Sequence, residues 1–307
     1  MKALRNVFTI ILIIMAGLFT SLNAQTARVQ VIHNSADAAA SVVDVWLNNT
    51  LLLDNFAFRT ATPFIDAPAG MEFTISVAGS NSKSSKEAIW SKNYLLKQGQ
   101  SYILVANGLI PASSVETDRN FDIYVYDMAR ESSKSDGKTD VMVFHGSTDA
   151  PVVDLYETGI GAGLLVDDLS YGEFSGYLEL SSADYVLSIT DQTGENTVVS
   201  YLAPLSTLNL QGYSLVALAS GFLNPLNAGD NGFGVWVALP MGGELVRLPV
   251  YSEETDSRQT ARVQVIHNSA DAAASVVDVW LNNTLLLDNF AFRTATPFID
   301  APAGMEF

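Results

Sequence analysis

Histidine, serine and aspartate recur together at one place in each of three similar segments of this sequence. The residues are His33, Ser35, Asp37 and Asp44 in the first segment, His145, Ser147, Asp149 and Asp154 in the second, and His267, Ser269, Asp271 and Asp278 in the third. These residue types could form the triad of a hydrolase, but triad members usually come from separate loops. Here the first three lie within five residues, and the chain has no Gly-x-Ser-x-Gly elbow. We expect no catalytic residue: Ser and Asp should cap a turn through bonds to backbone amides, while His packs at a strand end and donates a hydrogen bond inward.

Metal binding is the second chemistry that these residues suggest. A histidine and an aspartate four residues apart could supply two ligands, yet no third ligand follows at a diagnostic spacing. Two oxygen-rich loops, Glu116–Asp122 and Asn227–Gly232, resemble calcium loops in composition and lack the EF-hand spacing. We therefore expect solvated turns and no cofactor, with weak calcium binding as the open alternative.

Aromatic residues could form a flat platform on which a sugar ring stacks, provided that they face outward. The possible members are Trp46, Trp90, Trp236 and Tyr126. Because side chains alternate between the two faces of a strand, we expect Trp46 and Trp236 to pack in the core. Trp90 lies among charged residues and is the tryptophan expected to be exposed.

The elements that must position these residues are β-strands throughout the chain. Short runs rich in Val, Ile, Tyr and Phe alternate with polar residues, and Asn, Gly and Asp interrupt them at intervals typical of all-β domains. Val42–Leu53 should form a hairpin that turns at Asn48-Asn49, and Tyr185–Thr190 should pair with Thr197–Leu202. The pattern predicts tandem antiparallel β-sandwich domains with immunoglobulin-like layering. Small β-barrels are the alternative.

Two diverged repeats define the expected domains. Both contain a strand, His-x-Ser-x-Asp-Ala, Val-Val-Asp and a further strand; the first has two extra residues before Val-Val-Asp and lacks the proline of the second. We expect a signal peptide at 1–24, a first sandwich at 25–128, a linker at 129–139, a second sandwich at 140–251 and a linker at 252–258.

A third segment repeats the start of the first sandwich without one change. Gln25–Phe73 and Gln259–Phe307 are identical over 49 residues, an identity that folding constraints alone do not require. A recent duplication, an artefact of sequence assembly and deliberate engineering would each explain it. Half a sandwich leaves its core face wet and its strand edges unpaired, so this third copy should not fold alone. It could replace its twin in the same chain or link chains head to tail, although a truncated longer array is the simpler interpretation.

Composition indicates an exported protein. Lys2 and Arg5 precede an apolar run from Val7 to Phe19 that is short for a spanning helix, which favours a signal peptide over a membrane anchor. Losing these two cations with the leader takes the formal charge from −17 to −19. Such a surface repels nucleic acid and anionic lipid, so neither is an expected partner, and no membrane insertion is expected after cleavage. The chain has no cysteine, and its stability must come from its core.

The motif also resembles a known family. The pattern Ala-Arg-Val-x-Val-x-His-x-Ser-x-Asp-Ala followed by Val-Asp-Val is similar to that of a bacterial secreted family known as domain of unknown function 4397. The second repeat, His145–Asp154, is nearer to the family pattern, whereas the first departs from it by its insertion and missing proline. The resemblance implies one or several β-sandwich domains in an exported, often repetitive surface protein, and it implies no catalytic activity.

Three functional hypotheses follow. The leading one is a non-enzymatic, secreted or cell-surface repeat protein that acts as a structural or adhesive spacer and assembles with other copies of itself. The second is an extracellular module that binds a glycan or another ligand, with or without calcium. The third, a hydrolase that uses the His-Ser-Asp cluster, has the least support.

Overall fold

The computed structural model describes residues 25–110, 119–224, 231–252, 260–281 and 284–302. Nearly all of the regular structure is β-strand, as expected, and three short 3-10 turns interrupt it at Ala38–Ala40, Ser85–Glu87 and Ala272–Ala274. Among the described residues, no helix is long and apolar enough to cross a membrane.

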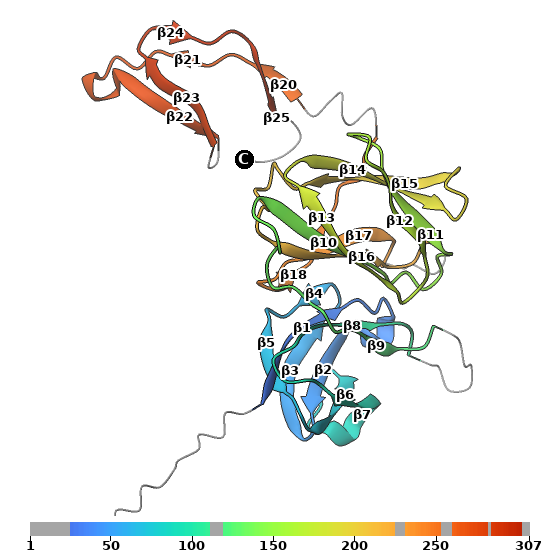
Figure 1. Cartoon of the computed structure of the whole chain (residues 1–307). Helices are drawn as coiled ribbons and strands as arrows, with labels where there is room; N and C mark the ends of the chain where they lie inside the picture. The colour runs from blue at the N-terminus through green and yellow to red at the C-terminus, as the bar shows by residue number, and fades with distance from the viewer. Residues whose placement is uncertain (1–24, 111–118, 225–230, 253–259, 282–283, 303–307) are drawn as a thin grey trace, which may run out of the picture.

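Residues 26–126 form a sandwich of two sheets (Figure 1). The first sheet contains β1 (Thr26–His33), β4 (Thr60–Ala61), β5 (Ile65–Pro68), β8 (Ser101–Asn107) and β9 (Asp122–Tyr126). The second sheet runs in the order β3 (Thr50–Ala57), β2 (Val42–Leu47), β6 (Glu72–Gly79) and β7 (Ala88–Leu95). Alternate side chains of β1 and β8, among them Val29, Val31 and Leu104, fill the space between the sheets.

The second sandwich repeats this plan. One sheet runs β13 (Phe174–Ser181), β10 (Lys138–His145), β16 (Ser214–Ser220), β17 (Gly234–Ala238) and β19 (Val246–Arg247). The other runs β12 (Gly163–Leu169), β11 (Val153–Glu157), β14 (Asp184–Asp191) and β15 (Thr197–Pro204). The sandwich prediction is confirmed, and the small-barrel alternative does not describe these open sheets. One detail differs from the prediction: β1 pairs with β8, and β10 with β16, in parallel.

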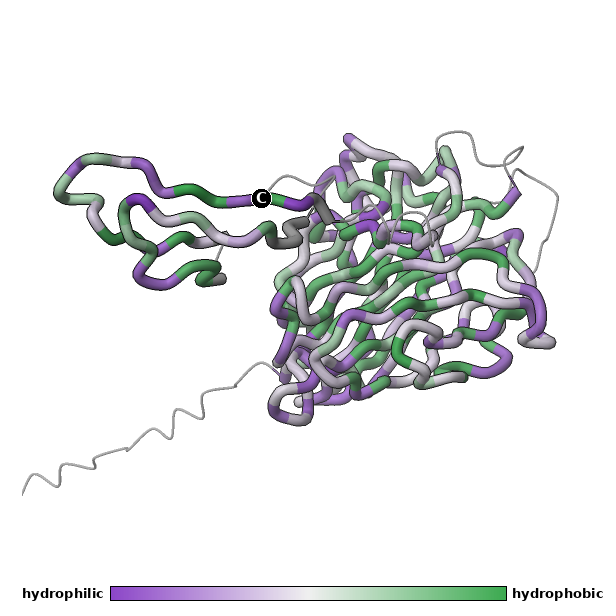
Figure 2. The backbone as a smooth tube through the Cα atoms, turned by 90° about the horizontal axis from the view of Figure 1, so that it is seen from above, coloured by the Kyte–Doolittle hydropathy of each residue, from purple (hydrophilic) through white to green (hydrophobic). Residues whose placement is uncertain are grey.

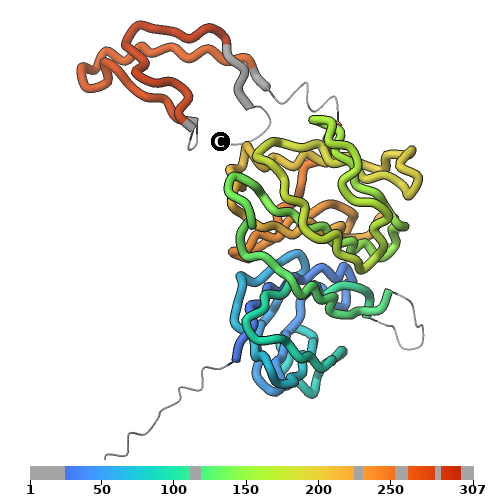
Figure 3. Tube along the Cα trace, in the orientation of Figure 1, coloured from blue at the N-terminus to red at the C-terminus, as the bar shows by residue number. Residues whose placement is uncertain are grey.

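The two sandwiches are packed against each other, so together they form four sheet layers. The outward side chains of β1, β8, β10 and β16 form a third apolar core between the sandwiches. Its large fully buried members are Ile32, Ile103, Val105, Met142, Phe144 and Leu218. In addition β18 (Gly243–Glu244), from the second repeat, pairs with β4 and extends the sheet of the first sandwich (Figure 3).

The segment 129–139, expected as a linker, is held against both sandwiches. Arg130 Nη1 donates to Asp140 Oδ2 at 2.7 Å and to Glu179 Oε1 at 3.0 Å, and its guanidinium covers the ring of Tyr177. On the other side, Arg28 Nε donates to Glu131 Oε1 at 3.0 Å. These contacts tie the connection between the repeats to the rest of the molecule.

The third copy contains β20 (Thr260–Val263), β21 (Ile266–His267), β22 (Val276–Leu281), β23 (Thr284–Ala291), β24 (Thr294–Ala295) and β25 (Ile299–Pro302). These strands pair in the same register as their twins in the first sandwich. Their apolar side chains, however, are uncovered: Ile266 is 65% exposed and Trp280 58%, whereas the identical Ile32 and Trp46 are 0% and 7% exposed. Figures 1 and 2 both show this copy to one side of the sandwiches.

Candidate functional site

The motif histidines bind a backbone carbonyl at the same place in all three copies. Nε2 lies 2.7 Å from the carbonyl oxygen of Ala40 for His33, 2.8 Å from that of Pro151 for His145, and 2.7 Å from that of Ala274 for His267. A carbonyl can only accept, so each Nε2 carries the proton. The two-residue insertion of the first repeat forms the turn Ala38–Ala40, which presents this carbonyl without a proline.

The first two histidines are buried and held neutral. His33 is 0% exposed, and burial lowers its pKa from 6.5 to about 4, an effect that the bond to Ala40 only partly opposes. Burial likewise lowers the pKa of His145. A general base works best with a pKa near the operating pH and with access to a substrate proton. Neither histidine meets these conditions.

The motif serines and first aspartates tie the motif loop to the segment that follows β8 or β16. Ser35 Oγ donates to the carbonyl of Gly108 at 2.6 Å, and Ser147 Oγ donates to that of Gly221 at 2.8 Å. Asp37 Oδ2 accepts from the amide of Ile110 at 2.7 Å, and Asp149 accepts from the amides of Leu223 and Asn224. The aspartates therefore bind backbone amides as expected, whereas the expectation that the serines do so is corrected, because they donate to a carbonyl.

The second aspartate of the motif supports a β-bulge. Asp44 Oδ1 accepts from the amide of Asn55, Asp154 Oδ1 from that of Asp168, and Asp278 Oδ1 from that of Asn289, at 2.7–2.9 Å. All three bulge residues have φ between 51° and 54°, in the left-handed region. The carboxylate, buried in Asp44 and Asp154, thus compensates a backbone conformation that costs free energy for a non-glycine residue.

The third copy, although uncovered, keeps several of these local bonds. Ser269 N donates to His267 Nδ1 at 3.3 Å, as Ser35 N does to His33 Nδ1, and Asp271 Oδ1 accepts from the amide of Ala273 at 2.8 Å. These local bonds of the motif loop therefore do not require a second sheet to cover it.

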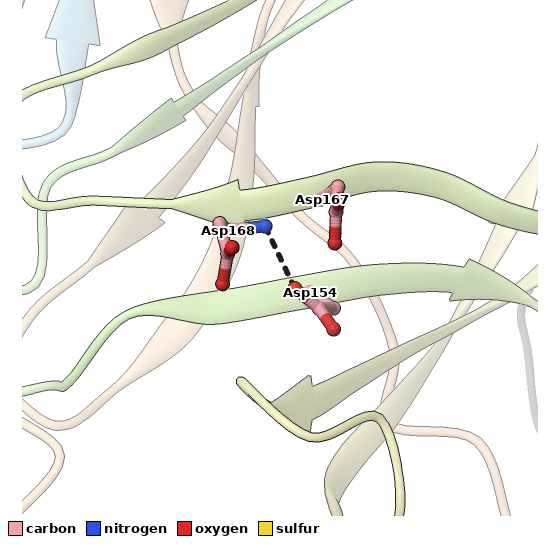
Figure 4. A group of neighbouring side chains, drawn as sticks. All are labelled: Asp154, Asp167 and Asp168. Atoms are coloured by element: carbon pink, nitrogen blue, oxygen red, sulfur yellow. Dashed lines mark hydrogen bonds between the residues drawn. The ribbon is translucent and has the colours of Figure 1, made fainter.

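The second bulge brings three carboxylates together (Figure 4). One oxygen from each of Asp154, Asp167 and Asp168 lies within 4.8 Å of the others; Asp154 is buried and the other two are exposed. Carboxylate oxygens are suitable calcium ligands. One oxygen of Asp154 already accepts a hydrogen bond from the Asp168 amide, so this carboxylate stabilises the β-bulge.

The two oxygen-rich loops expected to be solvated lie partly outside the described residues, at 116–118 in the first and 227–230 in the second. Of their described members, Asp122 forms an ion pair with Lys92, whose Nζ lies 2.8 Å from Oδ2. Asn231 Nδ2 donates to the carbonyl of Ala36 at 2.9 Å.

The aromatic residues proposed for sugar stacking do not form a platform. Trp46 is buried and donates from Nε1 to Ser82 Oγ at 2.9 Å. Trp90 is half-buried with its ring against Phe121, at a centroid distance of 5.5 Å, so the expectation of an exposed Trp90 is corrected. Trp236 and Tyr126 are half-buried and pack against the core between the sandwiches. Every described Phe, Tyr and Trp of the two sandwiches is at least half-buried.

Sequence reasoning missed the polar cluster where the two motif loops meet. Asn34, inside the first motif, donates to Asn107 Oδ1 at 2.9 Å and to the carbonyl of Ala219 at 3.4 Å. A Cβ at Gly146, inside the second motif, would overlap the Asn34 amide nitrogen and lie 2.9 Å from the Ala219 oxygen. The signal was the Asn-to-Gly difference at one motif position, which is interpretable only when the loops are known to touch.

Arg59 adds charge-assisted bonds to this junction. Its guanidinium donates to Ser220 Oγ at 3.1 Å and to the carbonyl of Gly232 at 2.8 Å, and it stacks 4.1 Å from the ring centroid of Trp236. Burial lowers the pKa of Arg59 to about 10, so the group is still a cation at neutral pH. The junction is therefore an apolar core with a hydrogen-bonded polar rim.

The profile of one family matches residues 27–156 and again 139–230, and the family is described as "Domain of unknown function (DUF4397)". The chain belongs to this family. The two DUF4397 matches together cover both motif loops, nearly all of the first sandwich, and the second sandwich as far as β16. No curated protein is significantly similar to the chain.

Two types of solved structure are weakly similar to this DUF4397 protein. One, an α-glucan-binding streptococcal virulence factor, has 9% identity and a TM-score of 0.21 over 62% of this chain and 92% of its own. The other, a candidate adhesin from Bacteroides ovatus, has 11% identity and a TM-score of 0.20 over 74% of this chain and 96% of its own. Such TM-scores carry no argument about function, which must therefore be argued from the residues of the chain itself.

Proposed function

We propose that this DUF4397 protein is a non-enzymatic, exported or surface-displayed protein whose paired sandwiches act as one rigid spacer or adhesive unit. The observation that carries the proposal is the apolar core between the sandwiches, with Ile32, Phe144 and Leu218 each 0% exposed. Domains joined only by a linker move relative to each other, whereas a large apolar interface removes this motion. A rigid unit transmits force and fixes reach, which a spacer requires.

The use of the motif residues supports a structural function. Their side-chain atoms bind backbone groups of the same molecule, as shown by His145 to Pro151, Ser147 to Gly221 and Asp149 to Leu223. A hydrolytic Ser-His pair would instead bring the serine oxygen within hydrogen-bonding distance of the imidazole. We therefore assign these residues to loop architecture. The acidic composition would keep such units soluble and favours partners other than nucleic acid.

The rigid-unit proposal is tested by a distance measurement between the sandwiches. The chain has no cysteine, so Lys86→Cys and Gln192→Cys, both at exposed positions, allow specific spin labelling of residues 25–307, at a concentration at which the protein is monomeric. We expect one narrow distance distribution by pulsed electron paramagnetic resonance. Leu218→Asp, in the core between the sandwiches, should broaden it, and Val198→Asp, on an exposed strand, should leave it unchanged.

A broad distance distribution in the spin-labelled protein without a core substitution would contradict the rigid-unit proposal. The non-enzymatic assignment is tested separately on a glycan array and a panel of ester, glycoside and peptide substrates. Specific glycan binding would favour the alternative of a ligand-binding module. Turnover that His145→Ala abolishes without unfolding the protein would overturn the structural assignment of the motif.

A further inference from the structure

A row of three apolar cavities runs between the sheets of the second sandwich. Their volumes are about 50, 90 and 50 Å³. The central cavity shares Val141, Leu187 and Ala217 with the 90 Å³ cavity at one end, and Ile189 and Ala219 with the cavity at the other end. Since the shared residues follow one another along β10, β14 and β16, the three cavities are neighbours in a row parallel to these strands.

The first sandwich also has an apolar cavity of about 50 Å³, with Leu104 in its wall, so the second differs in the additional space at the two ends. One small residue contributes to this difference. In the parallel pairing of the second sandwich, His145 lies opposite Ala219 and Val143 opposite Ala217. In the first sandwich, His33 lies opposite Ala106 and Val31 opposite Leu104. Leu104 and Ala217 are therefore structural equivalents, and the leucine side chain that projects into the first core is missing from the second.

The walls of the row determine what it could hold. The side chains that line the 90 Å³ cavity are all apolar and carry no polar atom. The other two cavities are also mainly aliphatic, with His145, Asp154, Tyr201 and Phe233 as the exceptions. A cavity of this kind stays dry, because a water molecule or a sugar needs polar partners, and an apolar cavity of roughly 150 Å³ is known to bind benzene or xenon. The combined space here is of that size, so the ligand must be small or slender and without buried polar groups.

The shape of the row favours a chain over a ring. From Val141 to His145 the row follows four residue steps of β10, about 13 Å at the rise of a β-strand. Exposed apolar side chains lie at both ends: Leu208 and Val246 at one, and Val198 at the other, each 43–52% exposed. These residues offer an apolar route from the surface to the interior.

We propose that the second sandwich binds an unbranched alkyl chain between its two sheets, with Ala217 at the centre of the site. The source of the chain is either a free medium-chain fatty acid or an acyl chain of a larger lipid. Burial of each methylene would provide the binding free energy, and the head group would stay at the mouth beside Leu208. This site lies on the inner faces of the second sandwich and is independent of the rigid-unit proposal.

The test is a titration of residues 25–307 with sodium decanoate and with 1-octanol, followed by calorimetry and by NMR of the methyl groups of the protein. We expect saturable binding of one alkyl chain per protein molecule. Ala217→Leu, which installs the residue of the first sandwich, should weaken binding at least tenfold. The reciprocal Leu104→Ala should open an equivalent site and raise the stoichiometry to two.

Sedimentation with phosphatidylcholine vesicles separates the two sources. Binding of decanoate without co-sedimentation supports a free fatty acid, and binding of both supports a lipid acyl chain. Ala217→Val serves if Ala217→Leu does not fold, as judged by circular dichroism. The valine side chain fills less of the cavity, so it should weaken binding to a lesser degree. No saturable binding to the wild-type protein, or equal binding by wild type and a folded Ala217→Leu protein, would overturn the proposal.

Discussion

The imidazole of His33 makes protein stability depend on pH, because the folded state keeps it neutral. Its pKa is 6.5 when exposed and about 4 in the fold, where burial disfavours the charged form. Between these values the unfolded state binds more protons, so the free energy of unfolding falls as pH decreases. The contribution is fully present above pH 6.5, and about 3 kcal/mol of it is lost by pH 4. His145 contributes with the same sign.

Denaturant titrations at a series of pH values measure this dependence, with His33→Gln as the comparison. The variant lacks the titrating group, so its stability should fall less steeply between pH 6.5 and pH 4, while contributions from the carboxylates cancel in the difference. Equal slopes for the two proteins would show that His33 is protonated in the folded state and would contradict its burial as a neutral group.

For single residues, the sequence predicted that the motif side chains bind the backbone, but it did not predict which backbone groups they bind. The types and spacing of His33, Ser35 and Asp37 indicated bonds to the backbone, and all three make such bonds, although Ser35 donates to a carbonyl and does not accept from an amide. The partner Gly108 lies 73 residues after Ser35, and Ile110 lies 73 residues after Asp37. Contacts over that separation depend on which strands become neighbours, which no local pattern in one sequence encodes.

Among the elements, the pairing of the two-residue strand β18 with β4 depends on Gly242, the residue directly before β18. Gly242 has φ +72°, and a Cβ there would overlap the backbone of Thr62 and Pro63 in the first sandwich. Gly242→Ala should therefore displace β18 from β4 and destabilise the protein by about 1–3 kcal/mol, from left-handed strain and the clash together. Thermal unfolding measures the loss, and broadening of the distance distribution between the sandwiches shows where it acts.

Gly212→Ala is the matched control for this prediction. Gly212 also has a left-handed φ, +84°, but a Cβ there would meet no atom within 4 Å. The control should show only the strain, about 1 kcal/mol, and an unchanged distance between the sandwiches. If both variants behave alike, the contact of β18 with β4 does not hold the sandwiches together.

Elements with a local signature were predicted well, and elements defined by the junction were not. Asn48, with φ 53°, turns the expected hairpin between β2 and β3, and the expected pairing of β14 with β15 is present. The clue to the junction was visible in β8 and β16, whose residues Tyr102–Ala106 and Leu215–Leu218 are continuously apolar. Such runs are typical of strands buried on both faces, whereas an isolated sandwich buries only one.

For the whole molecule, the structural unit is the pair of sandwiches. Each sandwich alone would expose the outer face of a sheet that bears Ile103, Val105, Met142 or Phe144, an apolar patch that soluble monomers rarely present. A longer array would therefore consist of rigid pairs rather than of independent domains. The third copy carries the side chains of the first member of such a pair, including Ile266, Arg293 and Phe298.

The uncovered third copy leads to a prediction about self-association. Its strands have the register of β1–β5, and its exposed Ile266, Trp280 and Phe298 are identical to residues that in the first sandwich are at most 8% exposed. The strands β6–β9 of a second molecule provide a surface that already fits this sequence. We expect residues 25–307 to form dimers and larger species as concentration rises, measured by light scattering after size-exclusion chromatography.

Residues 25–252 should remain monomeric with an unchanged melting temperature. Trp280→Ser should reduce association because it removes a large apolar side chain from the uncovered face, and its twin Trp46→Ser should destabilise the first sandwich instead. Strictly monomeric behaviour of both lengths at high concentration would contradict strand exchange between molecules.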